Sequence, residues 1–161
     1  DCPAVSLRLA CADDLPVLLP LVAAYHAHEG ISARPKAALD HTLRGLLDHP
    51  ERGRIWLIED AGTPVGYLAI AFGYSIELGG REAAIDEIYV QPASRGQGLG
   101  RSALCALVDW ASGQGLVALN LDVAPDNPGA RRLYARQGFG EVLGYDLMSL
   151  LLPSGIPPQA H

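Results

Sequence analysis

The sequence is short of positive charge, of cysteine and of long hydrophobic runs, and each shortage argues against a class of protein. It has 161 residues, with 12 Lys and Arg against 18 Asp and Glu, which gives a net charge of −6. Nucleic acids and anionic membranes are bound mainly by clustered Lys and Arg, so this balance argues against either as a partner. The same balance suits a cationic substrate.

Cysteine is scarce, and its spacing is unlike that of a metal site. The cysteines are Cys2, Cys11 and Cys105, and this odd number favours free thiols over a disulfide framework. We therefore predict reduced thiols in a cytoplasmic protein that holds no metal. Cys105 lies in a helical pattern and is expected to pack rather than react.

Long hydrophobic runs are also missing. The longest, residues 15–24, is about half a membrane span and is interrupted by Pro16 and Pro20. No basic start followed by an apolar run and a cleavage site is present, so we predict no secretory signal. Repeats are absent, and the one low-complexity segment is 153–158. We expect a single domain over 1–152 and a flexible tail over 153–161.

The order of hydrophobic patterns predicts an α/β fold with a mixed, mostly antiparallel sheet flanked by helices. Turn signals between the three central strands indicate an antiparallel meander. The run at 117–123 is nearly all apolar, which favours a strand buried on both faces. The expected strands are 5–9, 55–59, 65–74, 83–90, 117–123 and one or two within 139–152, and the expected helices are 13–28, 35–50, 103–113 and 127–138.

The most informative segment is the glycine-rich loop between residues 83–90 and the next helix. It reads Arg95-Gly96-Gln97-Gly98-Leu99-Gly100-Arg101. Glycines without side chains let backbone N–H groups converge on an anion at a helix N-terminus. The two arginines can neutralise phosphate charge as well. A pyrophosphate is the expected ligand, and a plain glycine-rich turn is the alternative.

Two common phosphate loops do not match this string. The dinucleotide fingerprint G-x-G-x-x-G fails because the third residue after Gly98 is Arg101. The triphosphate pattern G-x-x-x-x-G-K-[S/T] does not occur. What remains is R-x-x-G-x-G, followed downstream by N-x-x-A-x-x-L-Y-x-x-x-G-F. The defined places of the second pattern are filled by Asn127, Ala130, Leu133, Tyr134, Gly138 and Phe139.

Together the two motifs resemble those of the GNAT superfamily of N-acetyltransferases, and the resemblance extends to about residue 150. It implies a GNAT-type fold in which a splayed strand pair holds acetyl-CoA, with no metal. The backbone of Ile88, Tyr89 and Val90 would bind the pantetheine arm like an added strand. The other cofactor-binding residues that the resemblance implies are Arg95, Gly96, Gln97, Gly98, Leu99, Gly100, Arg101, Ser102 and Asn127. Asn127 also fits a helix cap.

The resemblance also assigns catalytic roles. Tyr134 would protonate the leaving thiolate, the alternative being a half-buried aromatic with a satisfied hydroxyl. A base is needed for the amine, and Asp86 and Glu87 are adjacent on the strand before the loop. Alternation sends them to opposite faces, so we select Glu87, although either carboxylate fits a strand surface equally.

The residues that bind the acceptor are the hardest to predict from the sequence. Relatives often line it with the end of the first helix, which implies Tyr25, His26 and Glu29, and solvated helix-end residues are the alternative. Tyr74 and Glu77, in a turn between strands, are similar candidates. A metal site at 25–29 is disfavoured, because histidines at i and i+2 do not share a helix face.

The predicted function is transfer of the acetyl group from acetyl-CoA to a primary amine by direct attack in a ternary complex. The acceptor would be a small molecule, a polyamine or a protein amine. The alternative is a non-catalytic acetyl-CoA sensor or interaction module, and a nucleotide-binding regulatory domain is disfavoured. An edge strand after Phe139 would support a homodimer.

Overall fold

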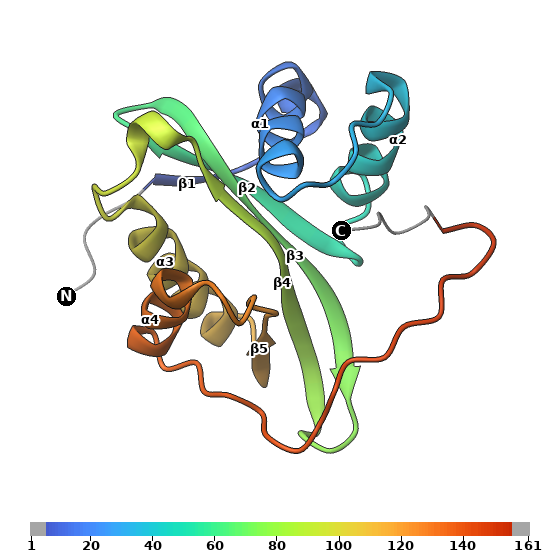
Figure 1. Cartoon of the computed structure of the whole chain (residues 1–161), viewed down its shortest axis with the longest axis vertical. Helices are drawn as coiled ribbons and strands as arrows, with labels where there is room; N and C mark the ends of the chain where they lie inside the picture. The colour runs from blue at the N-terminus through green and yellow to red at the C-terminus, as the bar shows by residue number, and fades with distance from the viewer. Residues whose placement is uncertain (1–5, 156–161) are drawn as a thin grey trace.

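A computed structural model describes residues 6–155, and its core is one five-stranded sheet with the strand order β1-β2-β3-β4-β5 (Figure 1). Strands β1 to β4 pair antiparallel, and β5 pairs parallel to β4. The predicted meander and the mixed, mostly antiparallel sheet are therefore confirmed. The strands are β1 (Ser6–Leu9), β2 (Gly53–Asp60), β3 (Thr63–Ser75), β4 (Gly80–Val90) and β5 (Ala118–Asn120).

Helices cover both faces of the sheet, and each face has its own hydrophobic cluster. Helices α1 (Leu15–His28) and α2 (Lys36–Leu47) pack with Leu57, Tyr67 and Tyr89 on one face. Helices α3 (Leu99–Gly113) and α4 (Pro128–Arg136) lie against the other face, where α3 packs with Ile58, Ile70 and Ile85. Short 3-10 turns, η1 (Ala12–Asp14) and η2 (Pro92–Ser94), precede α1 and α3. Successive side chains of β2 to β4 thus point alternately into two separate hydrophobic cores, one on each face of the sheet.

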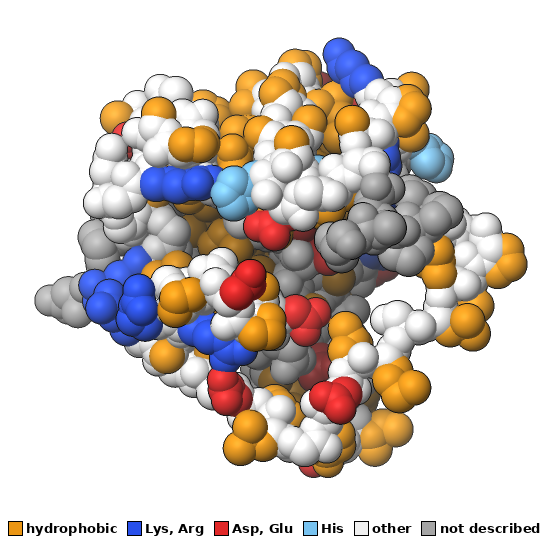
Figure 2. All heavy atoms as spheres, in the orientation of Figure 1, with side chains coloured by type: hydrophobic (Ala, Val, Ile, Leu, Met, Phe, Trp, Pro, Cys, Tyr) orange, Lys and Arg blue, Asp and Glu red, His pale blue; other side chains and the backbone are white. Residues whose placement is uncertain are grey.

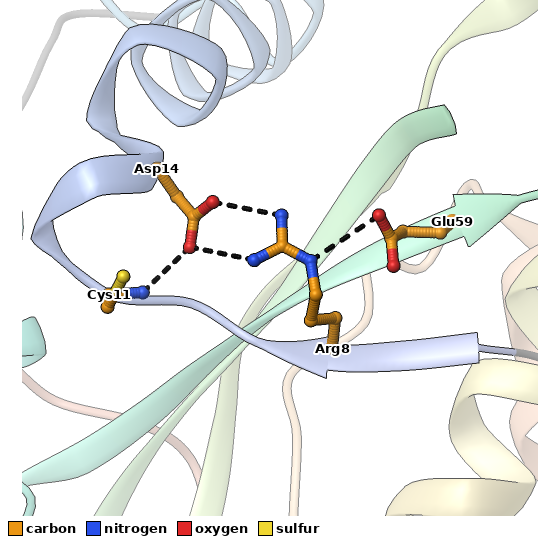
Figure 3. A network of polar contacts seen from close by, with 4 residues as sticks. All are labelled: Arg8, Cys11, Asp14 and Glu59. Atoms are coloured by element: carbon orange, nitrogen blue, oxygen red, sulfur yellow. Dashed lines mark hydrogen bonds and ion pairs between the residues drawn. The ribbon is translucent and has the colours of Figure 1, made fainter. Parts of the chain in front are cut away.

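A polar network ties the edge of the sheet to the start of α1 (Figure 3). Both terminal nitrogens of Arg8 on β1 donate to the carboxylate of Asp14, at 2.9 and 3.1 Å, and its Nε donates to Glu59 on β2 at 3.4 Å. The backbone N–H of Cys11 donates to the same Asp14 carboxylate at 2.9 Å. Asp14 therefore fixes the direction in which the chain leaves β1 for α1.

A β-bulge in β4 sets the direction of every residue that follows it. Ile85 pairs with Ile70 and Glu87 pairs with Ala69, so Asp86 is an extra residue on β4. The bulge shifts the alternation by one. Ile85 therefore faces the α3 side, whereas Glu87 lies on the α1 side together with Tyr89.

The main departure from prediction lies at the C-terminal end. No strand forms within 139–152 in the described part of the chain, so the prediction of one or two final strands there is wrong. Strand β5 is also shorter than predicted and only partly buried, because it lies at the edge of the sheet. Residues 156–161 of the predicted tail lie outside the described residues.

The cysteines and the hydrophobic runs can also be compared with their predictions. Cys105 is buried in α3 as expected, but it is disulfide-bonded, so the prediction of reduced thiols is wrong for this residue. Cys11 is free and exposed, and Cys2 lies outside the described residues. The cysteines therefore no longer argue for a cytoplasmic location. Among the described helices, none is long and apolar enough to cross a membrane.

Candidate active site

The second half of β4 has a free edge. Strand β5 pairs with β4 only through residues 82–84, because β5 ends at Asn120, the residue paired with Ala84. Within residues 6–155, the edge of β4 from Ile85 onward has no strand partner on the β5 side. One carbonyl at its end, that of Val90, accepts a hydrogen bond from Nε of Arg95 at 2.8 Å. The free edge lies where the predicted splayed strand pair would open.

The glycine loop continues from this edge into the N-terminus of α3. Gly96 and Gly98 have φ angles of 79° and 78°, a region that favours glycine, and Gly98 is the N-cap of α3. Open space surrounds both positions, and the first turn of α3 carries no acidic residue. The N-terminal end of the helix dipole, with exposed Arg95 and Arg101 beside it, is thus suited to a phosphate group.

The carboxylate of Glu87 is held between two side chains on the α1 side of the sheet. The hydroxyl of Tyr67 on β3 donates to its Oε1 at 2.9 Å, and Nε2 of His26 on α1 lies 2.6 Å from its Oε2. The side chains of His26 and Glu87 are only 13% and 18% exposed. A partly buried acid paired with an imidazole is a group able to take up and pass on a proton.

Aromatic rings surround this acid–imidazole pair. The ring of Tyr25 on α1 lies 5.8 Å from Tyr89 and 6.3 Å from Tyr67, centroid to centroid. Burial raises the pKa of the Tyr25 hydroxyl to about 12, and the nearby charges of Glu29 and Glu87 add to the effect. Burial and Glu87 likewise hold the pKa of Tyr67 well above its usual value. Both phenols therefore stay neutral and can donate hydrogen bonds at ordinary pH.

Tyr134 approaches the same region from the opposite side of the sheet. Its ring packs edge-on against Phe139 at 6.0 Å between centroids, within the hydrophobic cluster on the α3 side. Burial raises the pKa of its hydroxyl above the usual value of 10, and the charge of Glu29 at the end of α1 adds to this. Tyr134 thus remains a protonated phenol at neutral pH, as a proton donor must.

A comparison with known proteins matches this geometry to one family. Residues 21–139 match the family model described as the acetyltransferase (GNAT) family. The chain belongs to this family. The matched region contains the free edge of β4, the glycine loop, Glu87 and Tyr134.

Two relatives of known sequence are acetyltransferases by name. The chain is 30% identical over 138 residues to an uncharacterized N-acetyltransferase of Methanocaldococcus jannaschii, covering 84% of this chain and 61% of the relative. It is 29% identical over 135 residues to a mycothiol acetyltransferase of Beutenbergia cavernae, covering 70% and 43%. The chain thus spans less than two thirds of the length of either relative.

Solved structures confirm the GNAT fold. An integron cassette protein from the mobile metagenome of Cole Harbour Salt Marsh superposes with a TM-score of 0.81 and 34% identity, covering 94% of this chain and 91% of that one. A predicted acetyltransferase from Clostridium acetobutylicum, solved with acetyl-CoA, superposes with a TM-score of 0.72 and 22% identity, covering 91% and 96%. At that identity the second likeness shows the fold alone.

The structure brings some of the predicted GNAT residues together and separates others. Tyr25, His26 and Glu29 lie at the end of α1 beside Glu87, whereas Asp86 is exposed at the bulge. Tyr74 and Glu77 belong to the far end of the β3–β4 hairpin. Tyr74 pairs with Arg81, six residues before Glu87, which is roughly 20 Å along the strand. These two residues therefore do not join the site.

Two predicted cofactor residues have structural partners of their own. The side chain of Asn127 accepts a hydrogen bond from the backbone N–H of Ala130 at 3.1 Å, which confirms the helix cap. Ser102 is 3% exposed inside α3, so its side chain lies in the interior. Their contacts to acetyl-CoA stay predictions.

Tyr67 is the site residue that sequence reasoning missed. It lies inside a long apolar strand and is 1% exposed, so it reads as core. Only the pairing of β3 with β4 places its hydroxyl on Glu87, and the bulge at Asp86 decides that the two share a face. The pairing register of β3 with β4 would have revealed this contact, because it sets which residues of the two strands lie side by side. That register cannot be predicted from the sequence of either strand alone.

No cluster of three or more metal-ligating side chains occurs within 6–155. His28 is exposed and points away from His26, which faces Glu87.

Proposed function

We propose that this chain is an acetyl-CoA-dependent N-acetyltransferase that acts on a primary amine by direct attack in a ternary complex. The observation that carries the proposal is the Glu87 carboxylate, held by His26 and Tyr67 beside the free edge of β4. A fold that only bound acetyl-CoA would have no use for a partly buried acid–imidazole pair at that edge, because burying such a pair is costly.

On the donor side, the residues present suit an extended, phosphate-bearing molecule. The free edge of β4 over Ile88, Tyr89 and Val90 offers backbone groups to amides, and the glycine loop offers its backbone N–H groups to a pyrophosphate. Acetyl-CoA, when bound, supplies a thioester carbonyl that an amine can attack. A backbone N–H of the same edge would stabilise negative charge that develops on that carbonyl oxygen.

On the acceptor side, the ammonium form of the amine must lose a proton before its nitrogen can attack. Glu87 takes up this proton, directly or through a water molecule, and His26 can share the proton through its short contact with Oε2. Tyr67 fixes the other carboxylate oxygen and so orients the pair. Tyr25 and Glu29, on the same helix end as His26, form the adjoining wall.

The ammonium form of the amine loses two protons in the complete reaction. Glu87 takes the first before the attack and later returns it to solvent. The second leaves the nitrogen as the amide bond forms, and it replaces the proton that the Tyr134 hydroxyl gives to the thiolate as the carbon–sulfur bond breaks. The raised pKa of Tyr134 keeps that proton in place until a thiolate appears beside it.

The acidic balance of the chain favours cationic acceptors. The net charge is −6, and Glu29 and Glu87 both lie close to Tyr25 at the proposed acceptor site. The acceptor would be a small amine, a polyamine or a protein amine.

The decisive experiment measures thiol release from acetyl-CoA with a panel of amines. We expect at least one amine to give turnover, and Glu87→Gln to lower kcat/KM by roughly 100-fold or more. Glu51→Gln is a matched control, because Glu51 is exposed on the α2–β2 connection. Binding of acetyl-CoA without thiol release for any amine would instead favour the sensor function.

A further inference from the structure

A groove between α1 and α2 lies outside the proposed active site. These two helices lie side by side on one face of the sheet and are joined by the connection 29–35 (Figure 1). The groove is lined by residues 16–23 of α1, the end of the connection and the first turn of α2, and its volume is about 320 Å³. This volume is at the lower end of the range that small-molecule sites occupy.

Most of the groove lining is apolar. Leu19 of α1 and Leu39 of α2 are 6% and 7% exposed and belong to the same hydrophobic cluster. Pro16, Pro20 and Ala23 are exposed on the adjoining side of α1. The α1 positions recur at helical spacing, so they form an apolar strip that extends for roughly 10 Å along the helix axis. A strip of this shape suits an alkyl tail.

The same groove carries two positive charges. Arg34, at the end of the connection, is half-buried, and Lys36, the first residue of α2, is exposed. Neither side chain forms a hydrogen bond or an ion pair with another residue of 6–155. No Asp or Glu is among the described residues that line the groove. Two unpaired cations beside an apolar strip indicate an anionic ligand, although the chain as a whole has a net charge of −6.

The charge on the visible surface is distributed in the same way. In Figure 2 the surface over α1 and α2 carries many hydrophobic side chains, with Lys and Arg at its margins. Most of the visible Asp and Glu side chains lie below these helices, over the centre and the lower part of the molecule. An anion that approaches the groove therefore meets less repulsion than it would meet over the lower part.

We propose that this groove binds an amphipathic monocarboxylate, such as the anion of a medium-chain fatty acid. Its alkyl tail lies along α1, and its carboxylate lies between Arg34 and Lys36. The planar guanidinium of Arg34 can pair with both oxygens of a carboxylate. A phosphate monoester carries nearly two charges instead of one, so it costs more to bring beside an apolar wall.

The ligand is a small molecule rather than a peptide because of what the groove offers. The apolar strip lies on a helix, whose backbone groups are already bonded within the helix, so an extended peptide would find no strand to pair with. One apolar strip and one pair of cations match a ligand with a single tail and a single charged head.

Binding in the groove does not depend on the proposed acetyl transfer. His26, which contacts Glu87, lies in the last turn of α1, and Pro16 lies roughly 15 Å earlier along the helix axis. None of the residues that line the groove belongs to the proposed donor or acceptor site. The two proposals can therefore fail separately.

The first test is calorimetric titration of the whole chain with decanoate, below the concentration at which decanoate forms micelles. We expect saturable binding of one decanoate per chain, and binding at least tenfold weaker for butyrate, which lacks the long tail, and for decylamine, which has the opposite charge. Saturating acetyl-CoA should leave the affinity for decanoate unchanged. No saturable binding, equal binding of decylamine, or loss of binding with acetyl-CoA overturns the proposal. Tighter binding of decyl phosphate overturns the choice of a carboxylate.

The second test places the ligand in the groove by substitution. We expect Arg34→Gln to weaken decanoate binding at least tenfold, whereas Arg44→Gln, the matched control, leaves it unchanged, because Arg44 is paired with Asp40 and lies outside the groove. Ala23→Phe should also weaken binding at least tenfold, because the ring fills the groove. Ala24→Phe is its control, since Ala24 is exposed on α1 and does not line the groove. Circular dichroism checks that each variant is folded. Parental affinity in a folded Arg34→Gln or Ala23→Phe overturns the proposal.

Discussion

Glu87 is the residue in which the fold and the proposed chemistry meet. Its carboxylate accepts a hydrogen bond from the Tyr67 hydroxyl on β3 and contacts the His26 imidazole on α1. Three elements, β3, β4 and α1, therefore hold this one acid in place. Such a group loses conformational freedom when the protein folds rather than during the reaction, which is the basis of preorganised catalysis. The same contacts explain why His26 points inward although it lies in the last turn of α1.

Tyr134 allows a test of the proposed proton donor by its pH dependence. We expect Tyr134→Phe to lower kcat about 100-fold with little change in acetyl-CoA affinity, because only the proton is lost. Since burial and Glu29 raise the pKa of the hydroxyl above 10, kcat of the parent should fall on this account only above pH 10. The measurement is the pH profile of kcat for both proteins. If the variant retains the parental turnover, Tyr134 is a packing residue only.

Asp14 provides a prediction about stability in acid. The hydrogen bonds from Arg8 hold the pKa of its carboxyl below the usual 3.8, so the folded state binds this proton less tightly than the unfolded chain does. The stabilisation is therefore complete above about pH 4 and is lost as the pH falls below 3.8 towards the folded-state pKa.

Urea unfolding at pH 6 and pH 3 checks this. We expect Asp14→Asn to be less stable than the parent at pH 6, and to lose less further stability at pH 3 than the parent does. Asp109→Asn is the control, because Asp109 is exposed and forms no ion pair within the described residues. An equal loss in the parent and in Asp14→Asn would contradict the linkage.

At the scale of elements, the bulge in β4 links the two halves of the site. It follows directly after residues 82–84, where pairing with β5 ends, and it sets the face on which Glu87 lies. A bulge bends a strand and increases its twist, so it turns β4 away from β5 and leaves the free edge. One inserted residue thus accounts for both the donor edge and the position of the base.

Deletion of Asp86 tests this dual role. Without it, Ile85 and Glu87 become neighbours that still alternate, so Glu87 keeps its face and the hydrophobic cores keep their phase. We expect a folded protein in which β4 is straighter and β5 pairs further along it. Hydrogen exchange should show greater protection of the amides of Ile88 to Val90, and acetyl-CoA affinity should fall at least tenfold. Unchanged affinity with unchanged protection would show that the bulge does not create the free edge.

The sequence predicts the elements well and their relations less well. Turn residues and alternation located β2 to β4, and proline and glycine located the ends of the helices, because these signals are local. The facing of Glu87 could not be predicted, since it depends on an extra residue that only pairing with β3 reveals. The apolar residues of 139–152 predict one or two strands that do not form within the described residues, because such a pattern indicates a preference for pairing without specifying a partner.

The site itself was predicted unevenly for the same reason. The glycine loop and the Asn127 cap are short motifs whose geometry follows from neighbouring residues, so both lie where expected. The partnership of Glu87 with His26 spans 61 residues, and that with Tyr67 joins two strands. Contacts of this kind are decided by the packing of the α1 layer on the sheet, which no local pattern encodes.

At the scale of the whole molecule, the proposed donor site joins parts of the fold that otherwise touch little. The free edge of β4, the start of α3 and the cap of α4 all lie on it, while α1 supplies the opposite wall. A ligand that binds all of them only in the folded state must stabilise the whole domain. The size of this stabilisation is set by the ligand concentration relative to the dissociation constant of the ligand.

Thermal unfolding with acetyl-CoA is the corresponding measurement. At a ligand concentration of 100 times Kd, the stabilisation is about 2.7 kcal/mol. For a chain of this size, Tm should then rise by roughly 5–10 °C. Arg101→Ala should reduce the shift at the same concentration, because it removes a positive charge beside the N-terminus of α3. Glu87→Gln should retain the shift, because its carboxylate faces the acceptor side. An equal rise with NAD, or none with acetyl-CoA, would contradict the donor site, whereas a full rise in Glu87→Gln without turnover would separate donor binding from catalysis.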